Sequence, residues 1–268
     1  MKILCISDNE QNELYEGWTD EEAEKLKDVG LVLSAGDLDP DYLEFIETML
    51  NVPLLYVRGN HDSRYDEEPP EGCLDIDDKV VYLTVGDDSV ADVCESVTQG
   101  IQGRKLMPAE RTVLLRSVRS SADSAGGSET PFILKIAGLG GSVGRETEGE
   151  LYPEEDEFTE SEMASRCGQV SRKILDLSIQ DKFLSAFSVN NSAPLDILLT
   201  HSPCLGHGDL EDPAHRGFSC FNRLLEKWKP SYHIYGHVHM EYGRFDRMSI
   251  HPSGTTEINV SGMYMLDL

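Results

Sequence analysis

The feature that most constrains this chain is a pattern in which a short apolar run stops abruptly at side chains that can bind a metal. The clearest case is residues 56–62, Tyr-Val-Arg-Gly-Asn-His-Asp, where the mostly apolar run 52–57 ends and Gly59 frees the backbone to turn. We therefore expect a buried strand that delivers Asn60 and His61 at its carboxyl end.

Four other segments have the same arrangement, an apolar run followed by Asp, Asn, Glu or His. They are residues 3–10, 31–37, 197–201 and 233–239. In open α/β sheets, ligands collect at the carboxyl ends of the strands, so five such ends can converge on one pocket. The candidate ligands at these ends are Asp8, Glu10, Asp37, Asn60, His201, His237 and His239.

Each of these residues taken singly has a plainer interpretation. An aspartate such as Asp8 or Asp37 after a strand often caps the following helix, and a single histidine is more often a surface or hydrogen-bonded residue than a ligand. The conjunction of all of them in one order is what indicates a metal site.

Length and periodicity predict a single domain over residues 1–268 with an insertion at about 86–131. The insertion has weak periodicity and a Ser/Gly-rich stretch at 117–128, although residues 111–118 add a candidate strand. Helices are expected at about 19–29, 40–50, from about 159 onward, and 218–228. Strands at about 243–247, 251 and 256–260 should complete a second sheet.

Two further patterns have a structural and a functional interpretation. The glycine-rich run 138–142 resembles a phosphate cradle, but it lacks the Lys-Ser/Thr pair of a Walker motif and is better explained as a turn. An apolar stripe formed by Ile174, Leu175, Leu177, Phe183, Leu184 and Phe187 predicts one or two packed helices.

Composition limits the partners and the compartment. The net charge of −26 and the pI near 4.5 make the surface repel polyanions, which disfavours nucleic acid and anionic lipid as partners. No run approaches the roughly 18 apolar residues of a membrane span, and the first residues enter a strand, so we expect a cytoplasmic protein. The cysteines are expected to be free thiols, namely Cys5, Cys73, Cys94, Cys167, Cys204 and Cys220.

The ordered motifs, which span residues 8–239, resemble those of the calcineurin-like metallophosphoesterase family. Its pattern runs Asp-x-His, Gly-Asp, Gly-Asn-His-Asp/Glu, a lone His, and then Gly-His-x-His. The resemblance implies an α/β fold, a four-layer αββα sandwich of two mixed β-sheets flanked by helices. It also implies a metal-dependent phosphoesterase that hydrolyses a phosphomonoester or phosphodiester by in-line attack of a metal-bridging hydroxide.

The resemblance also implies a role for each residue. Asp37 would bridge two divalent metal ions. Asp8 and His239 would complete the ligands of the first ion, and Asn60, His201 and His237 would hold the second ion. His61 would assist the leaving group, with Asp62 orienting its imidazole.

One departure from the family pattern is Glu10, which stands where the family usually has histidine. A carboxylate there favours Mn²⁺ or Fe²⁺ over Zn²⁺ at the first site, whereas Zn²⁺ or Ni²⁺ remain alternatives at the second. Glu10 could instead contact a metal-bound water, or leave the first site weaker.

The expected substrate is a small phosphoester, with loop residues Arg145, His207, His215 and Arg216 as candidate contacts that could equally be solvated. Two alternatives stay open, a nuclease of the same family and a non-catalytic scaffold with the same fold. The oligomeric state is not predicted.

Overall fold

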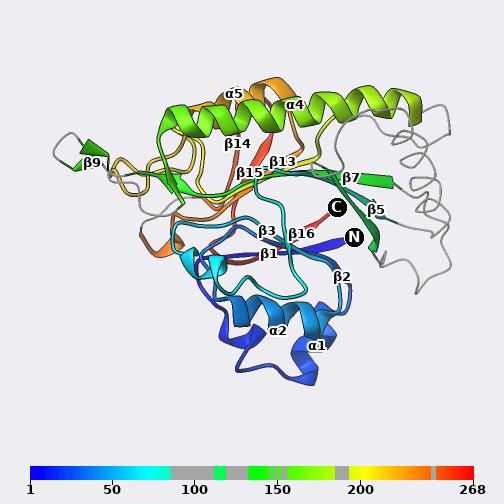
Figure 1. Cartoon of the computed structure of the whole chain (residues 1–268). Helices are drawn as coiled ribbons and strands as arrows, with labels where there is room; N and C mark the ends of the chain where they lie inside the picture. The colour runs from blue at the N-terminus through cyan, green and yellow to red at the C-terminus, as the bar shows by residue number, and fades with distance from the viewer. Residues whose placement is uncertain are drawn as a thin grey trace.

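The computed structural model describes residues 1–85, 112–118, 132–144, 146–147, 150–151, 156–184, 193–242 and 246–268. Two β-sheets lie face to face, and helices cover both outer faces (Figure 1). α1 (Asp20–Leu26) and α2 (Pro40–Leu50) cover one sheet, while α4 (Glu160–Leu184) and α5 (Ser219–Trp228) cover the other. The predicted four-layer αββα sandwich of two mixed sheets is confirmed.

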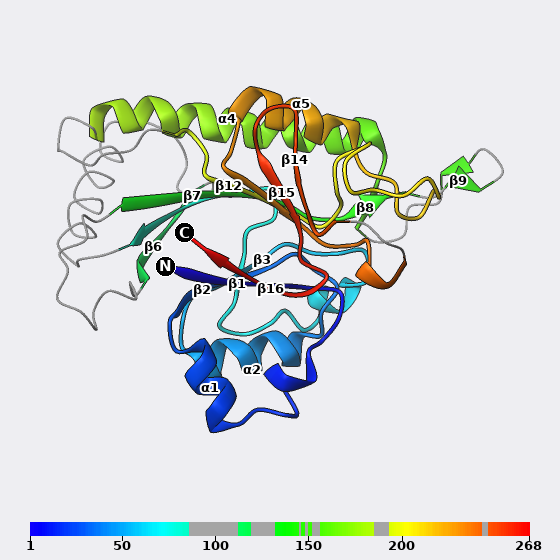
Figure 2. The ribbon, with the colours of Figure 1, turned by 180° about the vertical axis from the view of Figure 1, so that it is seen from behind.

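The first sheet has the strand order β16-β1-β2-β3-β4. Its strands are β1 (Lys2–Ser7), β2 (Val29–Ser34), β3 (Leu54–Tyr56), β4 (Leu74–Asp75) and β16 (Gly262–Asp267). The strands β1 to β4 are parallel, which suits their nearly continuous apolar sequences, because helices and the second sheet bury both faces. The final strand β16 was not predicted; it pairs antiparallel with β1 and brings the two termini together (Figure 2).

The second sheet has the strand order β14-β15-β13-β12-β7-β5-β6. Its strands are β5 (Val80–Val85), β6 (Thr112–Val118), β7 (Phe132–Leu139), β12 (Ile197–Thr200), β13 (Tyr232–Tyr235), β14 (Met248–Ile250) and β15 (Thr256–Asn259). The segments β7, β12, β13 and β15 are parallel, whereas β14 and β5 run antiparallel to their neighbours β15 and β7. Short ladders join β8 (Ser142–Val143) to β11 (Glu157–Phe158) and β9 (Glu146–Thr147) to β10 (Glu150–Leu151).

The predicted insertion is described only in part. Its candidate strand is confirmed as β6, which pairs in parallel with β5, whereas residues 86–111 and 119–131 lie outside the described residues. The strand expected at about 243–247 is partly outside the described residues, and the structure places β14 immediately after it.

The helices begin where the sequence signals predict. Thr19 caps α1 by accepting from the Glu22 N–H, and Asp39 caps α2 ahead of Pro40 at the first helical turn. In the long helix α4, Ile174 and Leu177 are buried as predicted, but Leu175 is 49% exposed. The predicted stripe was therefore too wide at Leu175, because adjacent helical positions face about 100° apart. The side chains of Phe183, Leu184 and Phe187 lie outside the described part of the chain.

No helix in the described part of the chain combines the length and the apolar character that a membrane span requires.

Three apolar clusters hold the layers together. One fills the space between the sheets, the second lies under α4 and α5, and the third lies under α1 and α2. The described cysteines are free thiols as predicted, namely Cys5, Cys73, Cys167, Cys204 and Cys220, and Cys94 lies outside the described residues.

Candidate metal centre

Three of the predicted ligands sit in a backbone conformation that non-glycine residues seldom adopt. Asp8, Asp37 and His237 have φ angles of 62°, 57° and 66°, and each follows the end of a strand. Left-handed backbone at such residues is uncommon and is maintained by the surrounding structure, often at functional sites. These turns direct the side chains at the ends of β1, β2 and β13 to a common edge.

The side chains of Asp37, Asn60, His201 and His237 meet at this edge. His201 Nε2 lies 3.1 Å from Asn60 Oδ1, 3.1 Å from His237 Nδ1 and 3.4 Å from Asp37 Oδ2. Potential ligand atoms of Asp37, His201 and His237 all lie within 4.8 Å of one another. The two sheets thus contribute to one cluster, Asp37 and Asn60 from the first and the two histidines from the second.

The hydrogen bonds of the two histidines leave one nitrogen of each ring facing the other. His201 Nδ1–H donates to the Ala35 carbonyl at 2.7 Å, and His237 Nε2–H donates to the Ala214 carbonyl at 2.7 Å. A carbonyl can only accept, so the remaining nitrogens present lone pairs to each other at 3.1 Å. A proton or a metal cation between them removes this repulsion, and the neighbouring carboxylate and amide oxygens fit a divalent cation.

The pKa shifts of these residues agree with that arrangement. Burial, with help from His201, holds the pKa of His237 well below its usual range, so His237 is neutral. Burial lowers the pKa of His201, but the carboxylates of Asp37 and Asp8 outweigh it and raise the pKa. The opposite directions of the two pKa shifts mean that a positive charge on His201 is favoured by the carboxylates and one on His237 is not.

Asp8 carries a buried oxygen that lacks a partner. Its Oδ1 accepts from the His237 N–H at 2.8 Å, but its Oδ2 has no hydrogen-bond partner among the described residues. Burial raises the pKa of Asp8, with a further contribution from Asp37. Buried polar atoms are almost always satisfied, so an orphaned carboxylate oxygen beside other ligands fits a missing cation.

The Gly-Asn-His-Asp turn is held in place by Asp62. Asp62 Oδ2 accepts from the Asp37 N–H at 2.9 Å and from the Gly59 N–H at 2.7 Å. A Cβ on Gly59 would lie 1.9 Å from Asp37 Oδ1, so only glycine fits there. Both hydrogen bonds join the Asp62 side chain to backbone amides of the turn. Its predicted role in orienting the His61 imidazole stays a prediction.

His61 itself is exposed at the rim of the cluster. Its backbone N–H donates to Asp37 Oδ1 at 2.9 Å, and its Nε2 lies 3.2 Å from Asn60 Nδ2. The imidazole is thus fixed beside a candidate ligand while it remains open to a solvent-borne molecule.

The hydrogen-bond and ring contacts of Glu10 and His239 within the described part of the chain are with residues other than Asp37, Asn60, His201 and His237. Glu10 Oε1 accepts from the Asp39 N–H at 3.3 Å, at the start of α2. His239 Nδ1 lies 3.3 Å from Asn9 Nδ2, which also donates to Ser261 Oγ. Asn9 was not among the predicted site residues, and the carbonyls that orient the histidines could not be predicted because backbone acceptors carry no sequence signature.

The candidate substrate residues separate into distinct places. The His215 ring lies 5.4 Å from the His237 ring and 4.9 Å from Tyr242, and its Nδ1 lies 2.9 Å from Asp212 Oδ1. Arg216 is exposed on the same loop. His207 faces Glu257 instead, and Arg145 lies outside the described residues.

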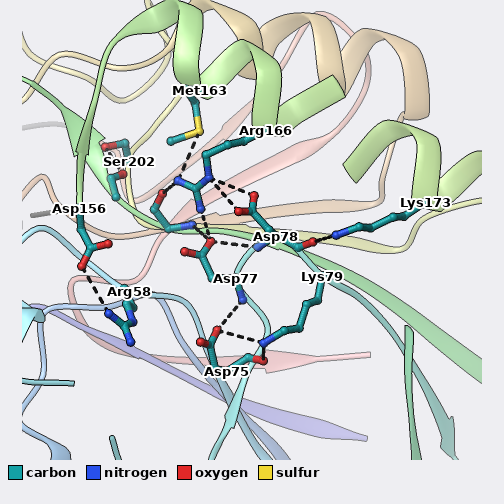
Figure 3. A network of polar contacts seen from close by, with 12 residues as sticks. Arg58, Asp75, Asp77, Asp78, Lys79, Asp156, Met163, Arg166, Lys173 and Ser202 are labelled. Atoms are coloured by element: carbon teal, nitrogen blue, oxygen red, sulfur yellow. Dashed lines mark hydrogen bonds and ion pairs between the residues drawn. The ribbon is translucent and has the colours of Figure 1, made fainter. Parts of the chain in front are cut away.

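An ion-pair network supports the back of the Gly-Asn-His-Asp turn (Figure 3). Arg166 on α4 pairs with Asp77 at 2.6 Å and with Asp78 at 3.0 Å, and it donates to the Gly140 carbonyl. The Gly141 N–H donates to the carbonyl of Arg58, the residue just before Gly59.

The same contacts explain the glycine-rich run. A Cβ on Gly140 would lie 2.5 Å from the Arg58 carbonyl oxygen, so this run allows two backbones to approach closely. Its interpretation as a structural turn agrees with this packing.

The chain is similar to known proteins over a short segment. It is 43% identical over 54 residues to the UPF0046 protein T07D4.2 of Caenorhabditis elegans, a match that covers 19% of this chain and 13% of that protein. It is 40% identical over 57 residues to the UPF0046 protein C25E10.12 of the same organism, which covers 19% of this chain and 20% of that protein. Neither name states an activity, and no protein-family profile matches the chain.

Two solved structures overlap with most of the chain at low identity. One crystal structure covers 99% of this chain and 94% of its own, with a TM-score of 0.49 and 13% identity. The crystal structure of TT1561 of Thermus thermophilus covers 97% of this chain and 89% of its own, with a TM-score of 0.41 and 13% identity. The fold assignment above depends on the strand order of this chain alone.

Proposed function

We propose that this chain is a metal-dependent phosphoesterase whose centre lies at the shared edge of the two sheets. The observation that carries the proposal is that His201 Nε2 and His237 Nδ1 face each other at 3.1 Å, with Asn60 Oδ1 and Asp37 Oδ2 beside them. Nitrogen and oxygen donors in this mixture suit the divalent metals of hydrolytic enzymes.

The proposed ligands divide between two ions. Asn60, His201 and His237 would hold one, Asp8 and His239 would hold the other, Asp37 would contribute to both, and Glu10 would contribute to the second group directly or through water. The orphaned Oδ2 of Asp8 supports the two-ion arrangement. When bound, divalent cations supply the charge that neutralises a phosphoryl group and activates water for in-line displacement. The carboxylates favour Mn²⁺ or Fe²⁺, with Zn²⁺ or Ni²⁺ as alternatives at the group that contains His201 and His237.

The residues of the chain have separate tasks in this reaction. His61, exposed at the rim, donates a proton or a hydrogen bond to the leaving-group oxygen. Asp62 holds the turn through the amides of Asp37 and Gly59, so both His61 and Asp37 keep their positions. Ala35 and Ala214 fix the tautomers of the two histidine ligands through their carbonyls.

The proposed substrate is a small phosphomonoester or phosphodiester. His215 lies next to the ring of His237, and Arg216 follows it on the same exposed loop, so both are placed to contact a phosphate or its leaving group. The net charge of −26 opposes a polyanionic substrate, which is why we favour a small ester over nucleic acid.

The test compares hydrolysis of phosphate esters by chelated protein and by protein reloaded with Mn²⁺. Wild type should recover activity on reloading, and Asp37→Asn should lose at least 100-fold in kcat/KM together with bound metal. Asp28→Asn is the matched control. Asp28 precedes β2 and pairs with Lys2, whereas Asp37 follows the other end of the same strand. Metal binding without hydrolysis of any ester would favour the non-catalytic scaffold, and tight DNA binding would favour a nuclease.

A further inference from the structure

A second cluster of potential metal ligands lies on the outer face of the second sheet, away from the centre described above. It contains Cys204 from the loop after β12, His233 from β13 and Glu257 from β15. All three are fully buried. The cluster lies under α5, whose Phe221 ring is 6.4 Å from the ring of His233 (Figure 1).

The tautomer of His233 follows from a neighbouring hydroxyl. Thr200 donates its O–H to the Ser202 carbonyl at 2.6 Å, so its oxygen can only accept from His233 Nε2 at 2.8 Å. His233 Nε2 therefore carries a proton. The other ring nitrogen, Nδ1, lies 3.7 Å from Cys204 Sγ and 3.2 Å from Glu257 Oε1.

These separations match the spacing of ligands around one zinc ion. Bond lengths of about 2.3 Å to sulfur and about 2.0 Å to nitrogen and oxygen place the ligand atoms of a tetrahedral ion roughly 3.3 to 3.6 Å apart. The observed separations are 3.7 Å for sulfur and nitrogen and 3.2 Å for nitrogen and oxygen. Ligand atoms of all three residues lie within 4.8 Å of one another.

His207 lies beside Glu257 of this cluster. The turn Cys204-Leu205-Gly206-His207 is closed by the His207 N–H on the Cys204 carbonyl at 3.1 Å, and Gly206 has a φ of 80°. His207 Nδ1 lies 3.3 Å from Glu257 Oε2, so its ring orients the carboxylate whose other oxygen faces His233. Metal-binding carboxylates typically have such a second partner.

From this geometry we infer that Cys204, His233 and Glu257 bind a zinc-type divalent cation, with His207 as the positioning residue of Glu257. A thiolate, an imidazole and a carboxylate form a donor set that Zn²⁺ prefers and that Mn²⁺ does not. The ion would tie the loop that carries Ala214 and His215 to β13 and β15, and so support the orientation of His237.

Cobalt substitution tests the inference without interference from the first centre. A Co²⁺–thiolate bond gives a near-ultraviolet charge-transfer absorption, and the ligands proposed for the first centre include no cysteine. Reduced, chelated wild type titrated with Co²⁺ should show this absorption, Cys204→Ser should lose it, and Cys73→Ser should retain it. Asp37→Asn should also retain the absorption, which separates this outcome from the fate of the proposed phosphoesterase.

A second variant keeps the test decisive if Cys204→Ser does not fold. His207 is 28% exposed on its loop, so His207→Ala should fold, and it should weaken Co²⁺ binding roughly 10- to 100-fold as loss of an outer-shell partner does. Absence of the thiolate absorption in wild type, its survival in Cys204→Ser, or an unchanged affinity in His207→Ala would each overturn the inference.

Discussion

The protonation of single side chains decides what the edge of these sheets can bind. Two backbone carbonyls accept hydrogen bonds from His201 Nδ1–H and His237 Nε2–H, so in the neutral rings the two nitrogens that face each other are both acceptors. This is a more specific indication of a cation than proximity alone, since ordinary hydrogen-bonded histidines pair a donor with an acceptor. Asp8 adds an orphaned oxygen to the same edge.

Removal of the exposed imidazole should separate catalysis from metal binding. We expect His61→Ala to lower kcat by about 10²- to 10⁴-fold, the usual contribution of general acid–base catalysis, while bound metal is unchanged. The measurement is steady-state hydrolysis alongside metal analysis of the same preparation. Undiminished turnover in the variant would remove His61 from the mechanism, and loss of metal would mean that it acts as a ligand.

Asp62 should make the metal-free protein less stable as pH rises. Burial, with the nearby Asp37 carboxylate, raises the pKa of Asp62 from 3.8 to about 6. Between these values the folded carboxyl holds a proton that the unfolded chain has released, so the free energy of unfolding falls as pH rises from about 4 to about 6. The stabilisation that comes from the protonated Asp62 carboxyl is fully present below about pH 4 and is lost above about pH 6.

The variant Asp62→Asn checks that sign, because an amide oxygen can still accept both backbone N–H groups. The free energy of unfolding of the chelated variant should depend less on pH. Above pH 6 it should exceed that of wild type by up to about 3 kcal/mol, the equivalent of a shift of about two pKa units. Urea denaturation of both proteins at several pH values measures this, and parallel pH profiles would contradict the assignment.

At the scale of elements, the site is built from strand ends and held from behind by a helix. Asp8, Asp37 and His237 follow their strands with a left-handed backbone conformation. Arg166 on α4 pairs with the loop that follows β4. The guanidinium contacts two carboxylates, the Gly140 carbonyl and the face of Phe158 at 4.3 Å. The turn that carries the ligands is thus coupled to the position of α4.

Loss of that guanidinium should destabilise the fold more than loss of an exposed arginine on the same helix. Arg166→Leu leaves the Asp77 and Asp78 carboxylates without their partner, and we expect a cost of about 3 kcal/mol. This is the low end for a buried pair, because the Asp78 side chain is 41% exposed.

The exposed Arg172, six residues further along α4, is the matched control. Arg172→Leu should change the free energy of unfolding by less than about 0.5 kcal/mol. Urea midpoints of the two variants give the comparison. Equal midpoints would show that the network in Figure 3 contributes nothing to stability.

At the scale of the whole molecule, a cation at the shared edge would join the two sheets. Asp37 and Asn60 come from the first sheet, and His201 and His237 come from the second. A ligand that binds only the folded state stabilises it by mass action. Cross-sheet binding therefore predicts that metal raises the stability of both sheets together.

Mn²⁺ should therefore raise the melting temperature of the chelated protein. At 100 times the dissociation constant the gain is about 2.7 kcal/mol, and a single cooperative transition should shift as a unit. The double variant Asp37→Asn, His201→Gln should show no Mn²⁺-dependent shift in differential scanning calorimetry. A shift that persists in this variant would place the stabilising ion elsewhere.

Much of the fold was predictable because its signals are local. Apolar runs that end in Asp, Asn, Glu or His predicted the strands β1, β2, β3, β12 and β13, and cap residues predicted the starts of α1 and α2. The failures involve long-range pairing. The last strand β16 returns to the first sheet because β1 offers it an antiparallel edge, and no local pattern specifies that partner.

The sequence by itself determined which residue types follow each strand, since short-range propensity and turn chemistry act on neighbouring residues. Only the tertiary structure decided which of those residues meet, because contacts between His201 and Asp37, or among Cys204, His233 and Glu257, join segments far apart in the chain. Packing of one layer on another brought both clusters together, and the hydrogen-bond partners of the imidazoles are two carbonyls in the first cluster and the Thr200 hydroxyl in the second. Neither the packing of the layers nor the partner of each imidazole can be assigned from a residue and its sequence neighbours alone.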